Sequence, residues 1–265
     1  MASLISAFKM IFKNRSMLFL TTYNEIKAKY AGSLFGLLWI ILYPLLLLGA
    51  YASVYIYVFN VRFQIFDSKE YVLLIFCGLI PFLGFTEALS NGVGSVTTNS
   101  NLMKNTLFPI ELAPVKSTFV SQTTQFAGMI ILLVTLGIFG RWSIYTPLLV
   151  LIWILQIMLS IGIAWILSSI NVFVRDLQNI IPIFVLLLMM VSPIAYPVDM
   201  VPSNLRIFLS LNPLYYLITC YQQVLMFGRF PDVKAFLILF VLALFTFGIG
   251  YSFFKKMKRV FVDNV

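Results

Sequence analysis

Apolar runs about as long as a membrane-spanning helix make up most of the chain. A helix needs about 20 consecutive apolar residues to cross the hydrocarbon core, because lipid offers no partner for unpaired backbone groups. Five runs reach this length, and a sixth is long enough although we expect Pro182 and Pro193 to bend it. The five are residues 36–59, 71–90, 115–139, 147–170 and 235–254, and the sixth is 177–196. The pattern predicts an all-α integral membrane protein with six transmembrane helices.

Residues 205–228 are also apolar enough to span a membrane, but Asn212 and Pro213 break this segment in its middle. Lys and Arg accumulate on the cytoplasmic side of membrane spans. Six spans with the N-terminus inside place twice as many Lys and Arg residues inside as outside, whereas a seventh span would move the basic cluster at 255–259 outside. We therefore expect two short half-helices that form a re-entrant outer hairpin between the fifth and sixth spans. A true span with an outside C-terminus is the alternative.

An amphipathic segment, residues 16–33, precedes the first apolar run. Apolar and aromatic side chains recur there every three or four residues and would stripe one face of a helix that lies in the membrane surface. They are Phe19, Tyr23, Ile26 and Tyr30. The first long apolar run begins only near Leu34, so we expect an uncleaved, cytoplasmic N-terminus. We interpret residues 1–265 as one domain, with interfacial helices in 1–33, a six-span core in 36–254 and a cytoplasmic tail in 255–265.

The composition supports a membrane protein. Hydrophobic residues make up 61% of the chain and charged residues 10%, whereas a soluble domain is about half apolar and a quarter charged. The net charge of +9 would also suit a nucleic-acid binder, but such proteins cluster their basic residues on a polar domain, which this chain lacks. Cys77 and Cys220 lie far apart within apolar runs, and histidine is absent. We therefore expect small packing residues rather than a disulfide or a metal site.

The sequence contains no energy source of its own. Nucleotide-driven pumps need a glycine-rich phosphate loop, and the chain has none. Ion-driven carriers place acidic groups within their spans, and Glu87 is the one clear candidate. It lies near the cytoplasmic end of the second span, where we expect its carboxylate to reach water or a Lys from the loop. Because a membrane transferase needs several convergent acids or a metal, we predict no catalytic residue, metal or cofactor in this chain.

The expected cytoplasmic loops carry two unusual groups of residues. Residues 91–114 hold apolar side chains outside any span, and exposed apolar groups mark an interaction surface. These side chains are Leu102, Met103, Leu107, Phe108 and Ile110. In a second loop, Arg175 and Asp176 interrupt a strongly apolar stretch at a tight turn, where they can form salt bridges across an interface. A solvated turn beside lipid headgroups is the alternative.

Four motifs follow one another along the chain: YAGSLFGLLWIILYP (30–44), NVFVRDLQNII (171–181), SPIAYPVDMVP (192–202) and LNPLYYL (211–217). Together they resemble the permease subunits of ABC-2 type polysaccharide exporters, which move O-antigen, capsule or teichoic-acid chains. The resemblance implies six spans, an outer hairpin at 202–229, a homodimer, a lipid-linked polysaccharide as cargo and a bacterial cytoplasmic (inner) membrane. It also implies two copies of a separate ATPase subunit, which binds ATP and Mg²⁺.

The resemblance further implies that cytoplasmic helices of the permease dock into the ATPase. Carried onto this sequence, the docking segments lie around residues 101–112 and 174–179, with the surface helix as a third contact. The residues that we expect to couple to the ATPase are Lys27, Lys29, Asn101, Leu102, Met103, Lys104, Leu107, Phe108, Arg175 and Asp176.

Tyrosines on the first span and near the outer mouth would suit a sugar polymer. A polysaccharide is polar along its edges but offers flat C–H faces, so aromatic rings can serve as sliding surfaces. Two copies would bring their first and fifth spans face to face around a channel on the dimer axis. The candidate channel-lining residues are Tyr43, Tyr51, Tyr55, Tyr196, Tyr215 and Tyr216, with Tyr57 and Tyr221 as further candidates. An ordinary interfacial aromatic belt is the alternative.

Other functions stay open on the sequence alone. An ABC-2 exporter of a small hydrophobic drug or lipid shares the same plan, because the matched motifs describe architecture more than cargo. An ion-coupled secondary carrier and a membrane glycosyl- or phosphotransferase are further alternatives, and a partner ATPase would exclude both.

Overall fold

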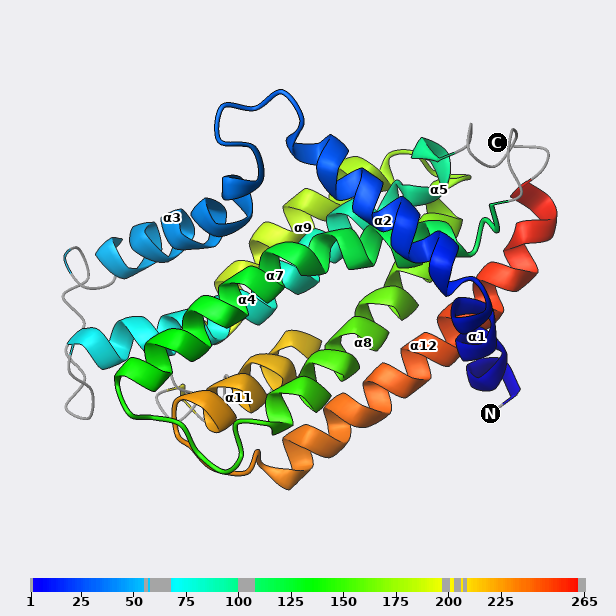
Figure 1. The fold of residues 1–265 in the computed structure, drawn as a ribbon. Coiled ribbons are helices and arrows are strands. Elements are labelled where there is room, and N and C mark those ends of the chain that lie inside the picture. Colours follow the sequence, from blue (N-terminus) through cyan, green and yellow to red (C-terminus); the bar gives the residue numbers. More distant parts are fainter. Residues whose placement is uncertain are drawn as a thin grey trace.

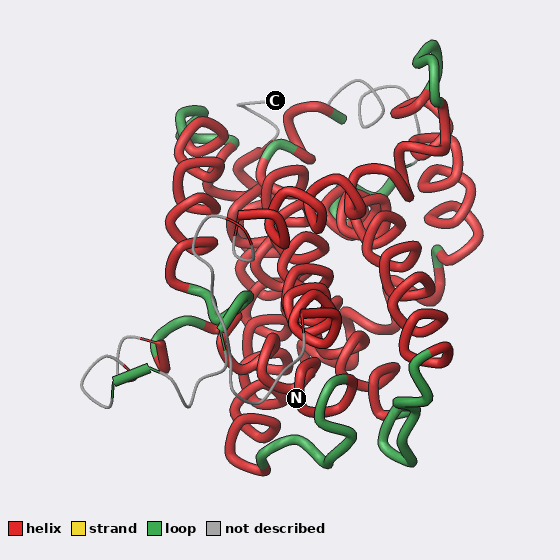
Figure 2. Tube along the Cα trace, turned by 90° about the vertical axis from the view of Figure 1, so that its left-hand side faces the viewer, coloured by secondary structure: helices red, strands yellow, loops and turns green. Residues whose placement is uncertain are grey.

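The described residues form helices joined by loops and turns, with no strand among them, as Figures 1 and 2 show. The computed structural model describes residues 2–54, 57, 68–99, 108–196, 201–202, 206 and 209–261. In chain order the helices are α1 (Ala2–Lys13), α2 (Arg15–Tyr30), the short 3-10 helix η1 (Gly36–Leu38), α3 (Trp39–Ser53), α4 (Ser68–Val93), α5 (Ser95–Thr98), α7 (Leu112–Ile138), α8 (Leu148–Asn171), α9 (Leu177–Val191), α11 (Pro213–Leu225) and α12 (Val233–Phe261). The predicted all-α class is confirmed.

Five stretches among the described residues are long and apolar enough to cross a membrane. They are Gly36–Ser53, Glu70–Val93, Leu112–Ile138, Leu148–Asn171 and Val233–Phe261. Each overlaps one of the five runs predicted from the sequence. The long helices lie alongside one another in a bundle (Figure 1). We term the end that carries α1, α2, α5 and the last turn of α12 the terminal end, and the end that carries α11 the distal end.

The span predicted at residues 177–196, the fifth in chain order, is shorter than expected. α9 has 15 residues and ends at Val191 rather than at residue 196. Ser192 is extended, with φ −78° and ψ 139°, because the ring of Pro193 disfavours helical geometry in the residue before it. Pro193 therefore follows the end of α9 instead of bending it, which corrects our expectation for this residue. α9 is apolar, and its assignment as the fifth of six spans stays a prediction.

α4 lies at the centre of the bundle. In its most apolar window 89% of the residues are buried, and α3, α7, α8, α9 and α11 all pack against it. α3 is peripheral by contrast, with 11% of its window buried. The core of the protein is therefore organised around one helix, and α3 presents most of its surface outward.

The Asn212-Pro213 break starts a helix. Asn212 is the N-cap of α11, and its Oδ1 accepts a hydrogen bond from the backbone N–H of Leu214 at 2.9 Å. Pro213 occupies the first helical position, where the missing N–H leaves no bond unmade. α11 packs among α4, α8 and α12, so protein covers its backbone. The half-helix expected before it lies largely outside the described residues, and the re-entrant hairpin stays a prediction.

α8 and α12 approach each other through two glycines. A Cβ added at Gly162 on α8 would overlap the backbone of Thr246 on α12, and one added at Gly250 on α12 would overlap the backbone of Gly162. Small residues let helix backbones pack closely, which matters in lipid because the hydrophobic effect does not drive helices together there. The contact therefore holds α12 against the core.

We expect Gly162→Ala to destabilise the fold by about 2 kcal/mol, because the added methyl group meets backbone atoms that cannot rotate away. Gly49→Ala is the matched control on α3, since no atom lies within 4 Å of a Cβ at that position. Labelling of the free, buried thiols of Cys77 and Cys220 during heating of the detergent-purified protein reports unfolding of each variant. An unchanged transition temperature for Gly162→Ala would contradict this account of the α8–α12 contact.

Candidate functional site

Two ion pairs connect α2 to the bundle at the terminal end. Lys29 Nζ lies 2.5 Å from Glu87 Oε1 on α4, and Glu25 Oε2 lies 2.6 Å from Lys116 Nζ on α7. Lys116 Nζ also donates to Asn99 Oδ1, just after α5, at 2.6 Å. Glu25 and Lys29 are four residues apart, so they share one face of α2. We term these five residues the α2 clamp.

The α2 clamp attaches α2 to the bundle, whereas the apolar residues of this helix contribute little buried surface. Leu18 is the buried residue of this helix, whereas Phe19 and Tyr23 of the predicted apolar stripe are exposed. A helix with so little buried apolar surface gains little from packing, so its position depends on the polar contacts that it makes. The predicted location of α2 in the membrane surface stays a prediction.

Lys116 is the buried centre of the clamp. Its side chain is 4% exposed, and an ammonium group removed from water needs both an opposite charge and hydrogen-bond acceptors. Glu25 provides the charge and Asn99 the second acceptor. The ring of Phe108 lies 5.9 Å from Nζ and adds a cation–π contact. Removal of either polar partner would leave part of the buried charge without compensation.

The Lys29–Glu87 pair is closer to solvent. The two side chains are 36% and 20% exposed, so water screens part of their attraction. Burial lowers the pKa of Lys29, but the charge and the hydrogen bond of Glu87 together outweigh this effect. The pKa therefore lies above the ordinary value of 10.5. Glu87 thus pairs with a Lys, as its position predicted, but α2 rather than the loop provides this Lys.

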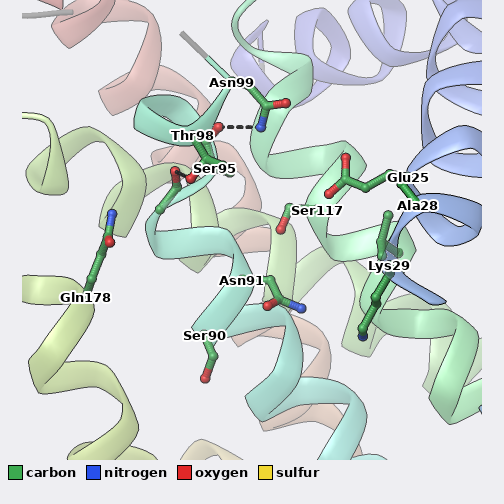
Figure 3. Close-up of a pocket in the computed structure, with 12 residues that line it drawn as sticks. Glu25, Ala28, Lys29, Ser90, Asn91, Ser95, Thr98, Asn99, Ser117 and Gln178 are labelled. Carbon is green, nitrogen blue, oxygen red and sulfur yellow. Dashed lines mark hydrogen bonds between the residues drawn. The ribbon is translucent and has the colours of Figure 1, made fainter. Parts of the chain in front are cut away.

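A polar pocket of about 480 Å³ adjoins the clamp (Figure 3). Its walls include Glu25 and Lys29 from α2, Asn91 from α4, Ser117 from α7 and Gln178 from α9. These amide, hydroxyl and paired charged groups suit hydrogen bonding. The described residues contain no group of three or more His, Cys, Asp or Glu side chains that could hold a metal.

Two of the three segments predicted to contact the ATPase line this pocket, and α5, which precedes the third segment in the sequence, lines it as well. α2 forms one wall, and α5 leads into residues 101–112. Gln178, within residues 174–179, donates from Nε2 to Thr97 Oγ1 on α5 at 3.2 Å. Asn99 Nδ2 donates to Ser95 O at 2.7 Å and extends the end of α5 (Figure 3). Segments that are far apart in the sequence are therefore hydrogen-bonded neighbours at the terminal end.

A second hollow of about 480 Å³ is lined by both members of the Lys29–Glu87 pair. Its lining includes Tyr30, Trp39 and Tyr43, and Lys29 lines both pockets. Tyr43, a candidate channel-lining residue, is therefore next to the clamp at the terminal end. Together the two pockets extend from the start of α3 to the charged groups that position α2.

The other predicted coupling residues lie in several environments. Lys27 is exposed, with Nζ 4.4 Å from the centre of the Tyr23 ring. Arg175 and Asp176 are exposed at the turn before α9, and within the described residues their side chains form no hydrogen bond or ion pair. Asn101, Leu102, Met103, Lys104 and Leu107 lie outside the described residues.

Phe108 departs from the expectation of an exposed apolar side chain. It is 8% exposed and packs with Leu112 and Ala113 against Met10 and Met17 from the two N-terminal helices. The expected exposure of Phe108 is wrong, because these helices cover the start of α7 and the loop sequence alone does not indicate that cover. Its coupling to an ATPase stays a prediction.

The candidate channel-lining tyrosines differ in their surroundings. Tyr51 is partly buried against the core. Tyr196 donates from its hydroxyl to Val191 O at 3.2 Å. Tyr215 and Tyr216 form an edge-to-face pair with ring centres 5.0 Å apart. Tyr55 lies outside the described residues, and the assignment of these tyrosines to a channel stays a prediction.

Sequence reasoning missed a cluster of buried amides in the core. Gln125 Nε2 donates to Gln156 Oε1 at 2.7 Å, and Gln156 Nε2 donates to Gln125 Oε1 at 2.8 Å. The hydroxyl of Tyr221 donates to Gln156 Oε1 at 3.0 Å. Tyr221 is fully buried, which corrects its place among the further channel candidates. A signal was present, because a polar side chain within an apolar run needs a partner inside the bundle.

The long apolar helices, the buried amides and the ion-paired terminal end define a multi-pass α-helical membrane protein. Residues 17–227 match the ABC-2 type transporter family, and the chain belongs to this family. The resemblance inferred from the four motifs is thereby confirmed at the level of the family.

Named relatives cover nearly the whole chain. The chain is 27% identical over 262 residues to the O-antigen export system permease protein RfbA of Myxococcus xanthus, covering 96% of this chain and 97% of the relative. It is 26% identical to an RfbA of Klebsiella pneumoniae, over 93% of this chain and 94% of the relative. The polysialic acid transport protein KpsM of Escherichia coli is also 26% identical, over 91% and 93%.

We expect Glu25→Gln to destabilise the protein more than Glu87→Gln. The first change leaves the buried ammonium of Lys116 without its counter-charge, and we expect it to cost about 2 kcal/mol, below the cost for a fully buried pair because Glu25 is 39% exposed. The second breaks a pair that solvent screens, and we expect at most about 1 kcal/mol. Thermal unfolding followed by labelling of Cys77 and Cys220 measures both, and the reverse order would contradict the clamp as described.

Proposed function

We propose that this chain is the membrane permease subunit of an ATP-driven exporter, and that two copies form a channel for a lipid-linked polysaccharide. The observation that carries the proposal is the similarity over more than nine-tenths of the chain to proteins named for O-antigen export and polysialic acid transport. The chain has no phosphate loop, so ATP and Mg²⁺ would bind in two copies of a separate ATPase subunit.

In the proposed topology the terminal end lies in the cytoplasm of a bacterium, and the chain crosses the cytoplasmic membrane six times. α9 provides the fifth span, and α11 forms the second half of a re-entrant outer hairpin. The basic residues support this orientation, since Lys9 and Lys13 on α1 and the cluster at residues 255–259 on α12 all belong to the terminal end.

Two uncovered helix faces support a second copy. α3 and α9 both pack on α4, and both expose apolar side chains to the outside of the bundle. On α9 these include Ile183, Leu186 and Met190, each more than half exposed. A two-fold dimer that brings α3 and α9 of each copy together would enclose a channel on its axis. Tyr43, Tyr51 and Tyr55 would then be close to the polymer path.

The α2 clamp gives a route from the ATPase to this channel. In the proposed mechanism ATP binding draws the two ATPase subunits together and moves the docking segments of the permease. α2 is ion-paired to α4 through Lys29 and to α7 through Glu25, so a displacement of α2 acts on both helices. The nucleotide would thus bias the permease between a shut and an open arrangement.

Reconstitution with the ATPase tests the proposal. The two subunits are co-purified, and hydrolysis of ATP is measured while lipid-linked glycans, small lipids or hydrophobic drugs are added one at a time. Stimulation by a lipid-linked glycan is the expected result. Stimulation only by a small lipid or drug would instead support an exporter of small hydrophobic cargo, and transport by the isolated chain on an ion gradient would contradict the proposal.

We expect Arg175→Ala and Asp176→Ala to weaken the coupling to the ATPase without affecting insertion, because both side chains are exposed and form no hydrogen bond or ion pair within the described residues. Loss of a charge pair across an interface costs about 1.4 kcal/mol or more, so ATPase affinity should fall about tenfold. Lys234→Ala, which removes an exposed charge at the distal end, is the control. Normal export in both variants would remove Arg175 and Asp176 from the docking surface.

We expect the double change Tyr51→Ala and Tyr55→Ala to impair polymer export more than assembly with the ATPase, because the aromatic surfaces would be lost while the docking segments stay intact. Tyr145→Ala removes an exposed aromatic side chain from the turn between α7 and α8 and serves as the control. Export of the polymer and co-purification of the ATPase are measured in parallel. Unchanged export would return Tyr51 and Tyr55 to a packing role.

A further inference from the structure

A basic pocket lies at the terminal end between α1 and α12, outside the α2 clamp. It is a hollow of about 550 Å³ lined by Ser3 and Ser6 of α1 and by Tyr251, Ser252, Lys255, Lys256 and Arg259 of α12. Three cations and four hydroxyl groups thus line one space. Among the described residues its walls contain no acidic side chain.

No acidic side chain in the described part of the chain neutralises the three cations. Within the described residues, Lys255, Lys256 and Arg259 form no ion pair, whereas Lys258 on the same turn lies 2.7 Å from Glu111. Lys255 and Arg259 are four residues apart on one helix, where like charges repel. A bound anion would relieve this repulsion, and the hollow that all three residues line is the place where such an anion would lie.

The wall formed by α1 is held in place by close packing. A Cβ added at Gly248 would lie 3.2 Å from Leu4 Cδ2, so the glycine lets α1 approach α12 closely. The ring of Phe8 lies 5.0 Å from that of Phe247. These contacts keep the hydroxyl of Ser3 and the N-terminal turn of α1 beside the basic turn of α12. The free N–H groups of a helix N-terminus carry partial positive charge, which adds to that of the cations.

Apolar surface adjoins the charged pocket. On α12, residues 245, 249, 252, 256 and 259 follow one another at intervals of three or four and therefore lie along one helix face. This face begins with the exposed apolar Phe245 and Ile249 and ends with the basic residues of the pocket. On α1, Ile5 and Phe12 are also strongly exposed. A ligand that matches this surface has an anionic head and an apolar chain.

We propose that this pocket binds the phosphate headgroup of an anionic membrane phospholipid, such as phosphatidylglycerol, with its acyl chains along Phe245 and Ile249. Basic pockets between membrane helices on the cytoplasmic side suit such headgroups. Inorganic phosphate or a nucleotide would satisfy the cations but leave the apolar face unmatched. α1 and the C-terminal part of α12 lie on the opposite side of the bundle from α3 in Figure 1, and the inference does not depend on the cargo or on the proposed export function.

Native mass spectrometry of the full-length chain in neutral detergent tests the proposal by titration with phosphatidylglycerol and with phosphatidylcholine. We expect tighter binding of phosphatidylglycerol, and we expect the triple change Lys255→Gln, Lys256→Gln and Arg259→Gln to weaken it by about fivefold for each cation removed. The control triple change, Lys9→Gln, Lys13→Gln and Arg15→Gln, removes the same charge from exposed positions of α1 and α2 that do not line the pocket. It should alter the affinity by no more than about twofold.

A second variant keeps every cation and blocks the space instead. Ser6→Phe places a bulky side chain in the hollow, and we expect the same selective loss of phosphatidylglycerol binding while labelling of Cys77 and Cys220 reports an intact fold. Equal binding of the two lipids, or equal weakening by both triple changes, would overturn the proposal. Displacement of phosphatidylglycerol by inorganic phosphate alone would also overturn it, because the site would then recognise the phosphate and not the lipid.

Discussion

Hydrogen bonds from buried amides to the backbone of α4 set the arrangement of the other helices. In lipid the hydrophobic effect does not drive helices together, so close packing and polar contacts must position them. Gln156 Nε2 on α8 donates to Pro81 O at 2.9 Å, and Gln122 Nε2 on α7 donates to Gly84 O at 3.1 Å. A side chain at Gly84 would collide with Gln125. These few contacts therefore fix the register of α7 and α8 on α4.

That register also determines which charged groups meet at the terminal end. Glu87 follows Gly84 by three residues on α4, and Lys116 precedes Gln122 by six residues on α7. Because α4 runs toward the terminal end and α7 runs away from it, both charged side chains reach the same region beneath α2 (Figure 1). Shifts of α4 or α7 along their axes would separate the partners in the clamp, so the amide contacts and the ion pairs depend on one another.

The sequence predicts the parts of this structure that depend on local pattern. Apolar length identifies the five long spans, and the capping preference of Asn212 with the fixed φ of Pro213 explains the start of α11. The partners of polar groups could not be predicted, because an apolar or amphipathic pattern shows which face is buried but not what covers it. Phe108 was therefore expected to be exposed, and Tyr221 was expected near a channel, although neighbouring helices bury both.

The charged side chains at the terminal end form two groups, those paired within the described part of the chain and those left unpaired there, and the two groups have different roles. The acidic side chains of Glu25, Glu87 and Glu111 are all occupied by lysines of the same chain, so they hold helices together. The cations left over have no acidic partner within the described residues, and they face outward or line the pocket between α1 and α12. A positive charge that the fold does not neutralise attracts anions at the surface. The internal ion pairs thus position the helices, and the remaining positive charge makes the same end of the bundle suited to an anionic membrane surface.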